Sequence, residues 1–251
     1  YDRVWQIYRE SFADASKFTM LLVGNINIDS LRPLLCQYVA TLPSSKNNTV
    51  SVEVPDRTKQ RAPNVRKADE AHLFRKKMNT PSALVNIFYT FEEPYTPKSD
   101  LILDVLQRVL QMAYTDSVRE EKGGTYGVSV SYSLEKDNHP TAMLRISFRT
   151  DPAKYEALIP LVYRQVTHIA DRGPNPVSMD KVKKYLLKTY GQNIIDNGYW
   201  DYVIYHQLQD GIDFHTGYKQ MVRNLTGRDV QKAAKDLLDS HRRIEVTMLS
   251  E

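Results

Sequence analysis

The sequence has one cysteine, no long apolar run and no concentrated basic stretch. The single cysteine, Cys36, excludes an intrachain disulfide and a zinc–thiolate cluster, and it leaves the redox compartment open. No apolar run reaches the roughly 20 residues that a membrane span requires. The net charge is only +4, from 34 basic and 30 acidic residues, and the densest basic run is Arg75-Lys76-Lys77, interpreted as a solvated strand end. These absences argue against a membrane-spanning protein and against a nucleic-acid-binding protein.

Histidine spacing gives no sign of a zinc site. No two of the six histidines lie four residues apart, and the nearest pair, His206 and His215, is separated by Gly211, which suggests a helix break. The sequence therefore predicts no metal ligands and no bound cofactor in this chain. The histidines are His72, His139, His168, His206, His215 and His241.

The composition is sufficient for a buried core. The chain has 251 residues, of which 41% are hydrophobic and 25% charged, typical of a large soluble α+β domain. We find no internal repeat and no low-complexity tract, and we interpret residues 1–251 as a single domain. The chain begins with Tyr1, and no signal peptide is visible, which is compatible with a processed product or an excised fragment.

Apolar periodicity predicts an α+β fold, a mainly antiparallel sheet with helices packed on one face. Strands are expected at Phe18–Gly24, His72–Arg75, Ala83–Tyr89, Tyr126–Leu134, Met143–Thr150 and Arg243–Leu249. Helices are expected at Val4–Ala13, Leu31–Val39, Ser99–Glu121, Pro152–Ala170, Met179–Asp196, Tyr199–Asp210, Phe214–Leu225 and Asp229–Asp239, with a polar connection from Ser44 to Ala68.

Local signals refine some of these elements. The continuous apolar run Phe18–Gly24 predicts a buried strand. Asp29 or Ser30 is expected to cap the helix that follows it, and Cys36 is expected to be a small buried hydrophobe on that helix. Ser99 is expected to cap the long helix.

The most informative stretch is VREEKGGTYGVS, residues 118–129. Arg119 and Tyr126 lie seven residues apart, across Gly123-Gly124, where a long helix should end and a strand should begin. Structural roles alone would explain both residues. An arginine near a helix C-terminus is favourable to the helix dipole, and Tyr126 begins the apolar side of the predicted strand.

With this motif the chain resembles the C-terminal, zinc-less half-domain of the inverted-motif zinc peptidases. This family includes pitrilysin, insulysin, the bacterial periplasmic zinc peptidases and the mitochondrial processing peptidase, and its members carry the same Arg–Tyr pair across a Gly-rich turn. Three further segments are similar to family sequences: Phe18–Asn25, Asn197–Trp200 and Leu225–Val230. The resemblance therefore extends over nearly the whole chain.

The resemblance implies a mitochondrial-processing-peptidase-like fold and a specific role. The chain would be the non-zinc-binding half of a metalloendopeptidase, which closes over the catalytic half and binds the substrate peptide. Arg119 and Tyr126 would be catalytic, as donors to the negative charge that develops on the scissile carbonyl oxygen. Gly123, Gly124 and Thr125 would bind substrate.

Zinc would belong to the catalytic partner, which carries H-x-x-E-H either in the same polypeptide or in a separate subunit. The isolated chain should therefore be inactive, since the metal supplies both nucleophile and Lewis acid. The family resemblance favours the periplasm or the cell envelope as the compartment.

Two alternatives remain open from the sequence. The chain could be a catalytically inactive structural or regulatory subunit, like the core subunits of the respiratory bc1 complex, or a standalone peptide-binding module. The presence of both Arg119 and Tyr126 argues for the peptidase half.

An aromatic cluster on one predicted helix also has two interpretations, of which we favour core packing over a wall of the substrate chamber. Its members are Tyr199, Trp200, Tyr202, Tyr205 and His206.

Overall fold

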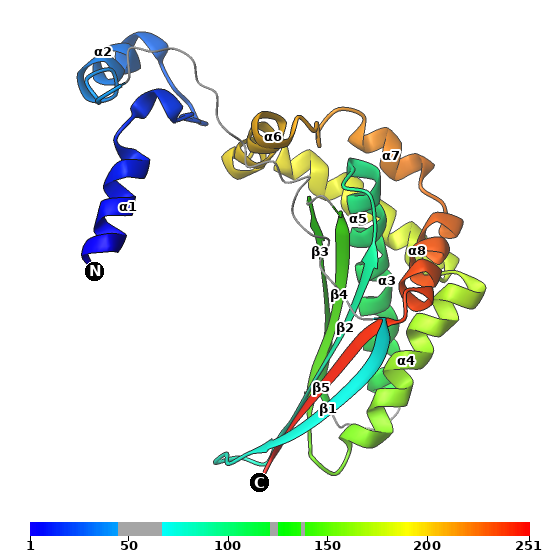
Figure 1. The fold of residues 1–251 in the computed structure, drawn as a ribbon. Helices are drawn as coiled ribbons and strands as arrows, with labels where there is room; N and C mark the ends of the chain where they lie inside the picture. Colours follow the sequence, from blue (N-terminus) through cyan, green and yellow to red (C-terminus); the bar gives the residue numbers. More distant parts are fainter. Residues whose placement is uncertain (45–66, 121–124, 137–138) are drawn as a thin grey trace. The chain divides into compact units, whose positions relative to one another are not determined.

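A computed structural model of the chain describes residues 1–44, 67–120, 125–136 and 139–251 (Figure 1). The chain divides into two compact units, which we describe separately. The first comprises residues 1–59 and 193–213, and the second comprises residues 60–192 and 214–251. The interpretation of residues 1–251 as a single domain stays a prediction. The predicted connection from Ser44 to Ala68 falls mostly outside the described residues.

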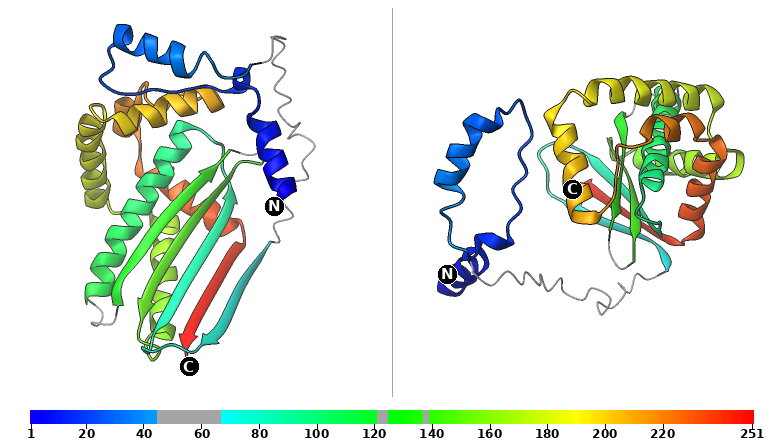
Figure 2. Two further views of the ribbon diagram at one scale, coloured as in Figure 1. Left: turned by 90° about the vertical axis from the view of Figure 1, so that its left-hand side faces the viewer. Right: turned by 90° about the horizontal axis from the view of Figure 1, so that it is seen from above.

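The second unit contains a five-stranded sheet in the order β1-β5-β2-β4-β3 (Figure 2). Every neighbouring pair is antiparallel except β1 and β5, which are parallel. The predicted, mainly antiparallel α+β fold is confirmed. The strands are β1 (Ala68–Lys76), β2 (Ala83–Glu92), β3 (Thr125–Glu135), β4 (Thr141–Thr150) and β5 (Arg242–Ser250).

The helices of this unit lie on one face of the sheet and leave the other face open, as Figure 1 shows for α3, α4 and α8. This arrangement is the predicted one. The helices are α3 (Pro97–Glu120), α4 (Tyr155–Arg172), α5 (Pro176–Asn193), α7 (Tyr218–Asn224) and α8 (Gly227–Asp239).

The core lies between the sheet and these helices. Strand β2 alternates between buried and partly exposed positions along most of its length, with Val85 and Ile87 completely buried. Helix α3 supplies Leu106 and Leu110, which are equally inaccessible to solvent. Tyr114 is 1% exposed, and its hydroxyl donates to the Val162 carbonyl oxygen at 3.0 Å, so its polar atom is satisfied inside the core.

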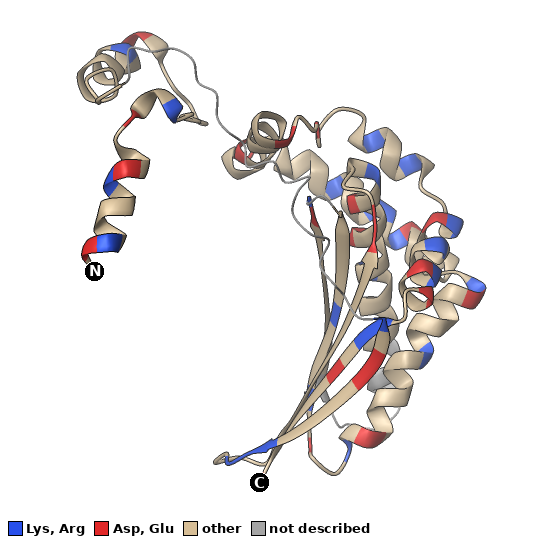
Figure 3. Ribbon diagram, in the orientation of Figure 1, with Lys and Arg blue, Asp and Glu red and all other residues tan. Residues whose placement is uncertain are grey.

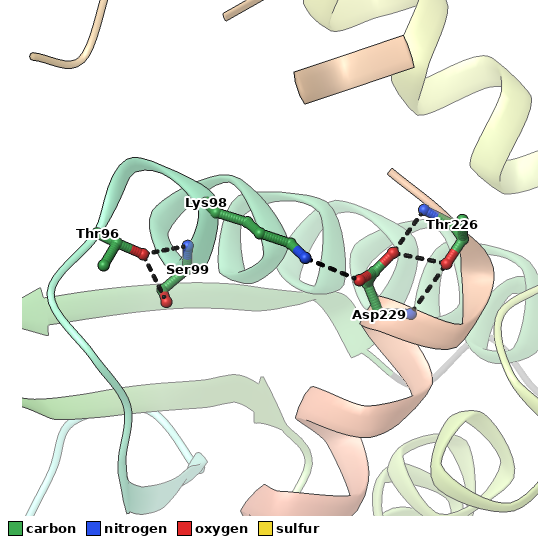
Figure 4. Close-up of polar contacts among 5 residues, drawn as sticks. All are labelled: Thr96, Lys98, Ser99, Thr226 and Asp229. Atoms are coloured by element: carbon green, nitrogen blue, oxygen red, sulfur yellow. Dashed lines mark hydrogen bonds and ion pairs between the residues drawn. The ribbon is translucent and has the colours of Figure 1, made fainter. Parts of the chain in front are cut away.

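Polar caps tie the start of α3 to the start of α8 (Figure 4). Thr226 and Asp229 form a reciprocal capping box at the start of α8, and Lys98 Nζ lies 3.4 Å from Asp229 Oδ1. At α3 the Thr96 hydroxyl accepts from the Ser99 backbone N–H at 3.1 Å. The prediction that Ser99 caps α3 is therefore wrong, because the helix starts at Pro97 and Thr96 occupies the capping position.

In the part of the first unit that the structure describes, there is no comparable core. Its elements are α1 (Asp2–Phe12), a 3₁₀ turn (Ala15–Lys17), α2 (Ile28–Tyr38) and α6 (Asn197–Asp210). Neither α1 nor α2 has a buried residue.

The prediction of a buried strand at Phe18–Gly24 is wrong. These residues form no strand, and Phe18, Met20 and Leu22 are 47%, 56% and 47% exposed. The physical reason is that a strand needs a neighbouring edge for its backbone hydrogen bonds, and the described residues offer none there.

Other expectations for this unit are also corrected. Helix α2 begins at Ile28, so its cap is Asn27, whose side-chain oxygen accepts from the Ser30 N–H at 3.0 Å, and neither Asp29 nor Ser30 has that role. Cys36 is exposed, because no element covers its side of α2 in the described chain.

The aromatic cluster on α6 does not form a core. Tyr202 and Tyr205 are 43% and 53% exposed, so the core-packing interpretation is wrong for both. Their rings lie edge-on to the ring of His206, with centroids 4.4 and 5.3 Å away. The cluster is thus a local aromatic contact on the surface of one helix.

The surface carries charges of both signs. Lys and Arg alternate with Asp and Glu over the helices, as Figure 3 shows, and the run Arg75-Lys76 is exposed at the end of β1 as predicted. Within the described ranges, no helix is both long enough and apolar enough to cross a bilayer.

Candidate functional site

The motif around Arg119 and Tyr126 is a helix–turn–strand unit formed by α3 and β3. Arg119 belongs to the last turn of α3, and Tyr126 is the second residue of β3. Both positions agree with the predicted elements. Gly123 and Gly124 lie outside the described residues, and Thr125, the first residue of β3, pairs with Thr150 of β4.

A β-bulge lies at the start of β3. Thr125 pairs with Thr150 and Val128 with Phe148, so β3 has one more residue than β4 over this interval. Gly127 within the bulge has a φ of +125°, a backbone conformation that side-chain-bearing residues rarely adopt. The regular strand register is therefore interrupted between Thr125 and Val128. Bulges commonly occur beside active sites, where they redirect a side chain.

The sequence alone did not reveal this bulge. Its signal was present, since Gly127 is an isolated glycine in an otherwise regular strand pattern, and such glycines often mark bulges.

A side-chain clamp from Gln111 fastens α3 to the outer edge of β3. Gln111 Nε2 donates to the Val128 carbonyl oxygen at 2.5 Å, and its Oε1 accepts from the Val130 N–H at 3.1 Å. Because β3 is the last strand in the sheet, the carboxamide takes the place of a neighbouring backbone at this edge. The sequence analysis missed Gln111, because nothing in the local pattern distinguishes it from other polar helix residues.

The clamp is close to both motif residues along the chain. Gln111 precedes Arg119 by eight residues, about 12 Å along a helix, and Val128 follows Tyr126 by two. A second tie lies farther along, where the Tyr132 hydroxyl bonds Asp100 Oδ1 at 3.0 Å. Two polar links and a buried apolar face therefore hold α3 and β3, the elements that carry residues 119 and 126, as one frame.

None of the described helices of this unit covers the open face of the sheet (Figure 1). The side chains on this face include apolar ones. Phe88 of β2 lies opposite both Arg145 of β4 and Ile244 of β5 in the strand register, and Ile244 is 46% exposed. Arg145 Nη2 and Nε donate to Asn86 Oδ1 at 2.7 and 3.1 Å, and its guanidinium lies 5.6 Å from the Phe88 ring centroid. This face thus presents apolar surface and an oriented cation together.

The side chains that the structure describes do not form a zinc site. Across the described ranges, no group of three or more His, Cys, Asp or Glu side chains is close enough to hold a metal. His206 Nδ1 and Asp210 Oδ2 are 2.8 Å apart, but a structural zinc site needs four ligands and a catalytic site three.

Comparison with known proteins identifies relatives of the chain. A family model described as the peptidase M16 inactive domain matches residues 1–186. The chain is 20% identical over 205 residues to the probable zinc protease PqqL of Haemophilus influenzae, covering 77% of this chain and 21% of that protein. It is 22% identical over 188 residues to the protein of the same name in Escherichia coli, covering 74% and 18%. The chain therefore spans about a fifth of the curated relatives that it matches.

Solved structures share the fold. The periplasmic protease PqqL from Escherichia coli superposes with a TM-score of 0.68 at 18% identity, over 91% of this chain and 25% of that one. The ferredoxin protease FusC, crystallised as its E83A mutant with Arabidopsis ferredoxin, gives 0.67 at 15% identity, over 91% and 24%. A peptidase M16 inactive domain from Pseudomonas fluorescens gives 0.58 at 16% identity, over 72% and 43%.

Proposed function

Because the chain belongs to the family of peptidase M16 inactive domains, we propose that it is the non-zinc-binding part of a zinc metalloendopeptidase. It closes over a zinc-binding catalytic half and binds the substrate peptide between them. Two curated relatives are named probable zinc proteases, which supports this role. The zinc belongs to the catalytic half, in the same polypeptide or in a separate subunit.

Arg119 and Tyr126 are proposed as the donors that this chain contributes to catalysis. During peptide hydrolysis the scissile carbonyl oxygen gains negative charge, and donors placed to meet that charge stabilise the transition state more than the substrate. The guanidinium offers fixed donors and a permanent positive charge, and the phenol offers one O–H. The turn residues Gly123, Gly124 and Thr125 are proposed to contact the substrate backbone.

The observation that supports this proposal best is the α3–β3 frame. The Gln111 clamp joins the middle of α3 to Val128 and Val130 of β3, and the Tyr132–Asp100 bond joins the first turn of α3 to the later part of β3. Precise positioning matters because catalytic donors lose most of their effect when they are displaced by about 1 Å. The bulge at Gly127 interrupts the regular strand geometry next to Tyr126, as bulges beside active sites commonly do.

The open sheet face is proposed to hold the substrate peptide beside these donors. It combines exposed apolar side chains with the fixed guanidinium of Arg145. The periplasm or cell envelope is proposed as the compartment, since one related structure is described as a periplasmic protease.

The test uses the assembled peptidase, with both halves present. Tyr126→Phe and Arg119→Ala should each lower kcat by about ten- to a thousandfold while the zinc content stays unchanged. Tyr185→Phe and Arg164→Ala change exposed residues on other helices and serve as matched controls with wild-type kcat. Residues 1–251 alone, without the catalytic half, should not hydrolyse peptides.

Wild-type turnover in the Arg119→Ala, Tyr126→Phe double variant would remove both residues from the mechanism. The structural or regulatory subunit would then be the better description of the chain.

A further inference from the structure

Two arginines of β4, Arg145 and Arg149, lie on the open face of the sheet. Burial alternates along β4, with Leu144, Ile146 and Phe148 buried in the core, and both arginines occupy exposed positions of the opposite face. Because they are four residues apart on one strand, their backbones lie about 13 Å apart along it. The open face therefore carries two cationic side chains in one line.

Neither arginine of β4 forms an ion pair with a carboxylate in the part of the chain that the structure describes. The arginines of β5 differ in this respect. Arg242 Nη2 lies 3.1 Å from Glu92 Oε1, and Arg243 Nη2 lies 3.7 Å from Asp69 Oδ2. The sheet thus neutralises the cations of β5 and leaves those of β4 available to a ligand.

Arg145 is held in place by two residues of β2. Its Nε and Nη2 donate to Asn86 Oδ1 at 3.1 and 2.7 Å, and its guanidinium carbon lies 5.6 Å from the Phe88 ring centroid. A guanidinium has more N–H donors than these two bonds use, so donors remain for a ligand. Since the side chain is already oriented, a carboxylate that binds it immobilises less than it would on a freely rotating cation.

Apolar side chains lie beside the two arginines on the same face. In the strand register Leu84 and Phe88 of β2 are opposite the arginines, and Met248 and Ile244 of β5 are opposite these two residues in turn. A row of apolar side chains on neighbouring strands therefore runs parallel to the two cations.

The strands that flank β4 have their acidic residues at the other end of this face. Glu92 of β2 and Glu135 of β3 are both in register with Thr141, the first residue of β4. Arg149, near the end of β4, is one residue away from the partner of Thr125, the first residue of β3. Positive charge is therefore concentrated toward the end of the face where β3, the strand of the second motif residue, begins.

We propose that Arg145 and Arg149 bind acidic side chains of the substrate peptide, so that preferred substrates carry Asp or Glu among apolar residues in the segment on the open face. This inference rests on the proposed function, because it names the class of peptide that this face holds. Carboxylates form charge-assisted and often bidentate hydrogen bonds with arginine. The spacing of the two cations matches carboxylates four residues apart in an extended peptide, since any extended chain rises about 3.3 Å per residue.

Matched substrate pairs test the proposal in the assembled peptidase. One peptide carries Glu at two positions four residues apart in an apolar sequence, and its twin carries Gln at both. The pair of positions is moved along the peptide relative to the cleaved bond, one residue at a time. At the best position the Glu peptide should have a kcat/KM about tenfold higher than its twin, because hydrogen bonds between charged groups are the stronger ones. The preference should decrease as NaCl is added, since exposed charges are screened.

Variants assign the preference to the two arginines. Arg145→Gln and Arg149→Gln should each reduce it to about threefold, and the double variant should abolish it, since separate sites contribute roughly independently. Arg164→Gln removes the same charge from an exposed position of α4 and should keep the wild-type preference. The readout is a ratio of two substrates in one enzyme preparation, so partial unfolding of a variant does not change it.

Three outcomes would contradict the inference in different ways. Equal kcat/KM for every Glu peptide and its Gln twin would overturn it and leave the proposed function in place. A full preference in the double variant would also overturn it alone, because the acidic residues would then be recognised elsewhere. Cleavage of no peptide by an assembled, zinc-loaded protein would overturn the proposed function, and the inference with it.

Discussion

Two regions of this chain are rich in apolar residues but differ in how far those residues are buried. Strands β2 and β4, with α3 between them in the sequence, place Ile87, Ile146 and Leu106 completely out of solvent. Residues 1–44 contain α1, α2 and an extended apolar segment, yet neither helix has a buried residue. The difference shows that apolar patterning predicts which residues should be buried, whereas burial also requires a partner surface within reach.

The largest effect that follows from this comparison concerns the core. Ile87→Ala should lower the free energy of unfolding of residues 1–251 by about 2–5 kcal/mol, because it leaves a cavity between the sheet and its helices. Leu22→Ala removes a similar volume from the exposed segment and should change that free energy by less than about 0.5 kcal/mol. Urea unfolding of both variants measures the difference. Equal losses would show that Leu22 is buried in the isolated chain.

A smaller effect is expected at the clamp between α3 and β3. Gln111→Ala removes both hydrogen bonds to the edge of β3 and should cost about 1–3 kcal/mol of stability. In the assembled peptidase it should also lower kcat, because the frame formed by α3 and β3, which carry residues 119 and 126, loosens. Gln107→Ala, one turn earlier on the same helix, is the control. If Gln111→Ala is as stable and as active as Gln107→Ala, the clamp does not hold α3 and β3 together as one frame.

The capping box of α8 gives a pH-dependent effect of about 1 kcal/mol, as measured for other helix caps. Burial raises the pKa of Asp229, but hydrogen bonds from Thr226 and Lys98 outweigh this and hold it below its ordinary value of 3.8. A lowered pKa in the folded state means that Asp229 contributes stability above about pH 4, and that this is lost as the pH falls through its folded pKa.

Asp229→Asn should therefore lower the free energy of unfolding at pH 7. The difference in free energy of unfolding between this variant and wild type should become smaller below pH 4. Thermal unfolding of both proteins across this pH range measures the difference. A stability difference that does not change with pH would show that the negative charge of Asp229 does not stabilise this cap.

The smallest effect is expected at Cys36. It is exposed on α2, so Cys36→Ser should change the stability of residues 1–251 by less than about 0.5 kcal/mol. A thiol reagent should also label Cys36 quickly in the folded chain. A thiol that reacts only after unfolding would show that α2 is covered in the isolated chain and would weaken the contrast between the two regions.

The sequence predicted the second unit well because the partners of its strands lie in the same chain. The ranges expected for β2 and β5 agree with the structure to within a few residues, since each alternating pattern has a neighbour on both sides. The continuous apolar run at Phe18–Gly24 predicted a strand that does not form, and Cys36, which was predicted to be buried, is exposed. Local pattern carries no information about whether a partner edge is present.

The sequence predicted only part of the candidate site. The features that it did not predict depend on packing between two elements, and not on a missing partner edge. Arg119 and Tyr126 fall at the predicted helix end and strand start, but the bulge at Gly127 and the Gln111 clamp depend on contacts between α3 and β3. Those contacts depend on how α3 packs against β3, which the sequence pattern does not give. The roles of the two residues stay predictions, since position alone does not establish chemistry.

The central claim is that Tyr126 and Arg119 bind the transition state more tightly than the substrate. The most direct test compares a substrate peptide with its phosphinic analogue, which imitates the tetrahedral intermediate, in the assembled peptidase. In Tyr126→Phe and Arg119→Ala the inhibition constant of the analogue should rise by the same factor by which kcat/KM falls, with KM nearly unchanged. An unchanged inhibition constant, with the loss of kcat/KM appearing only in KM, would contradict the account.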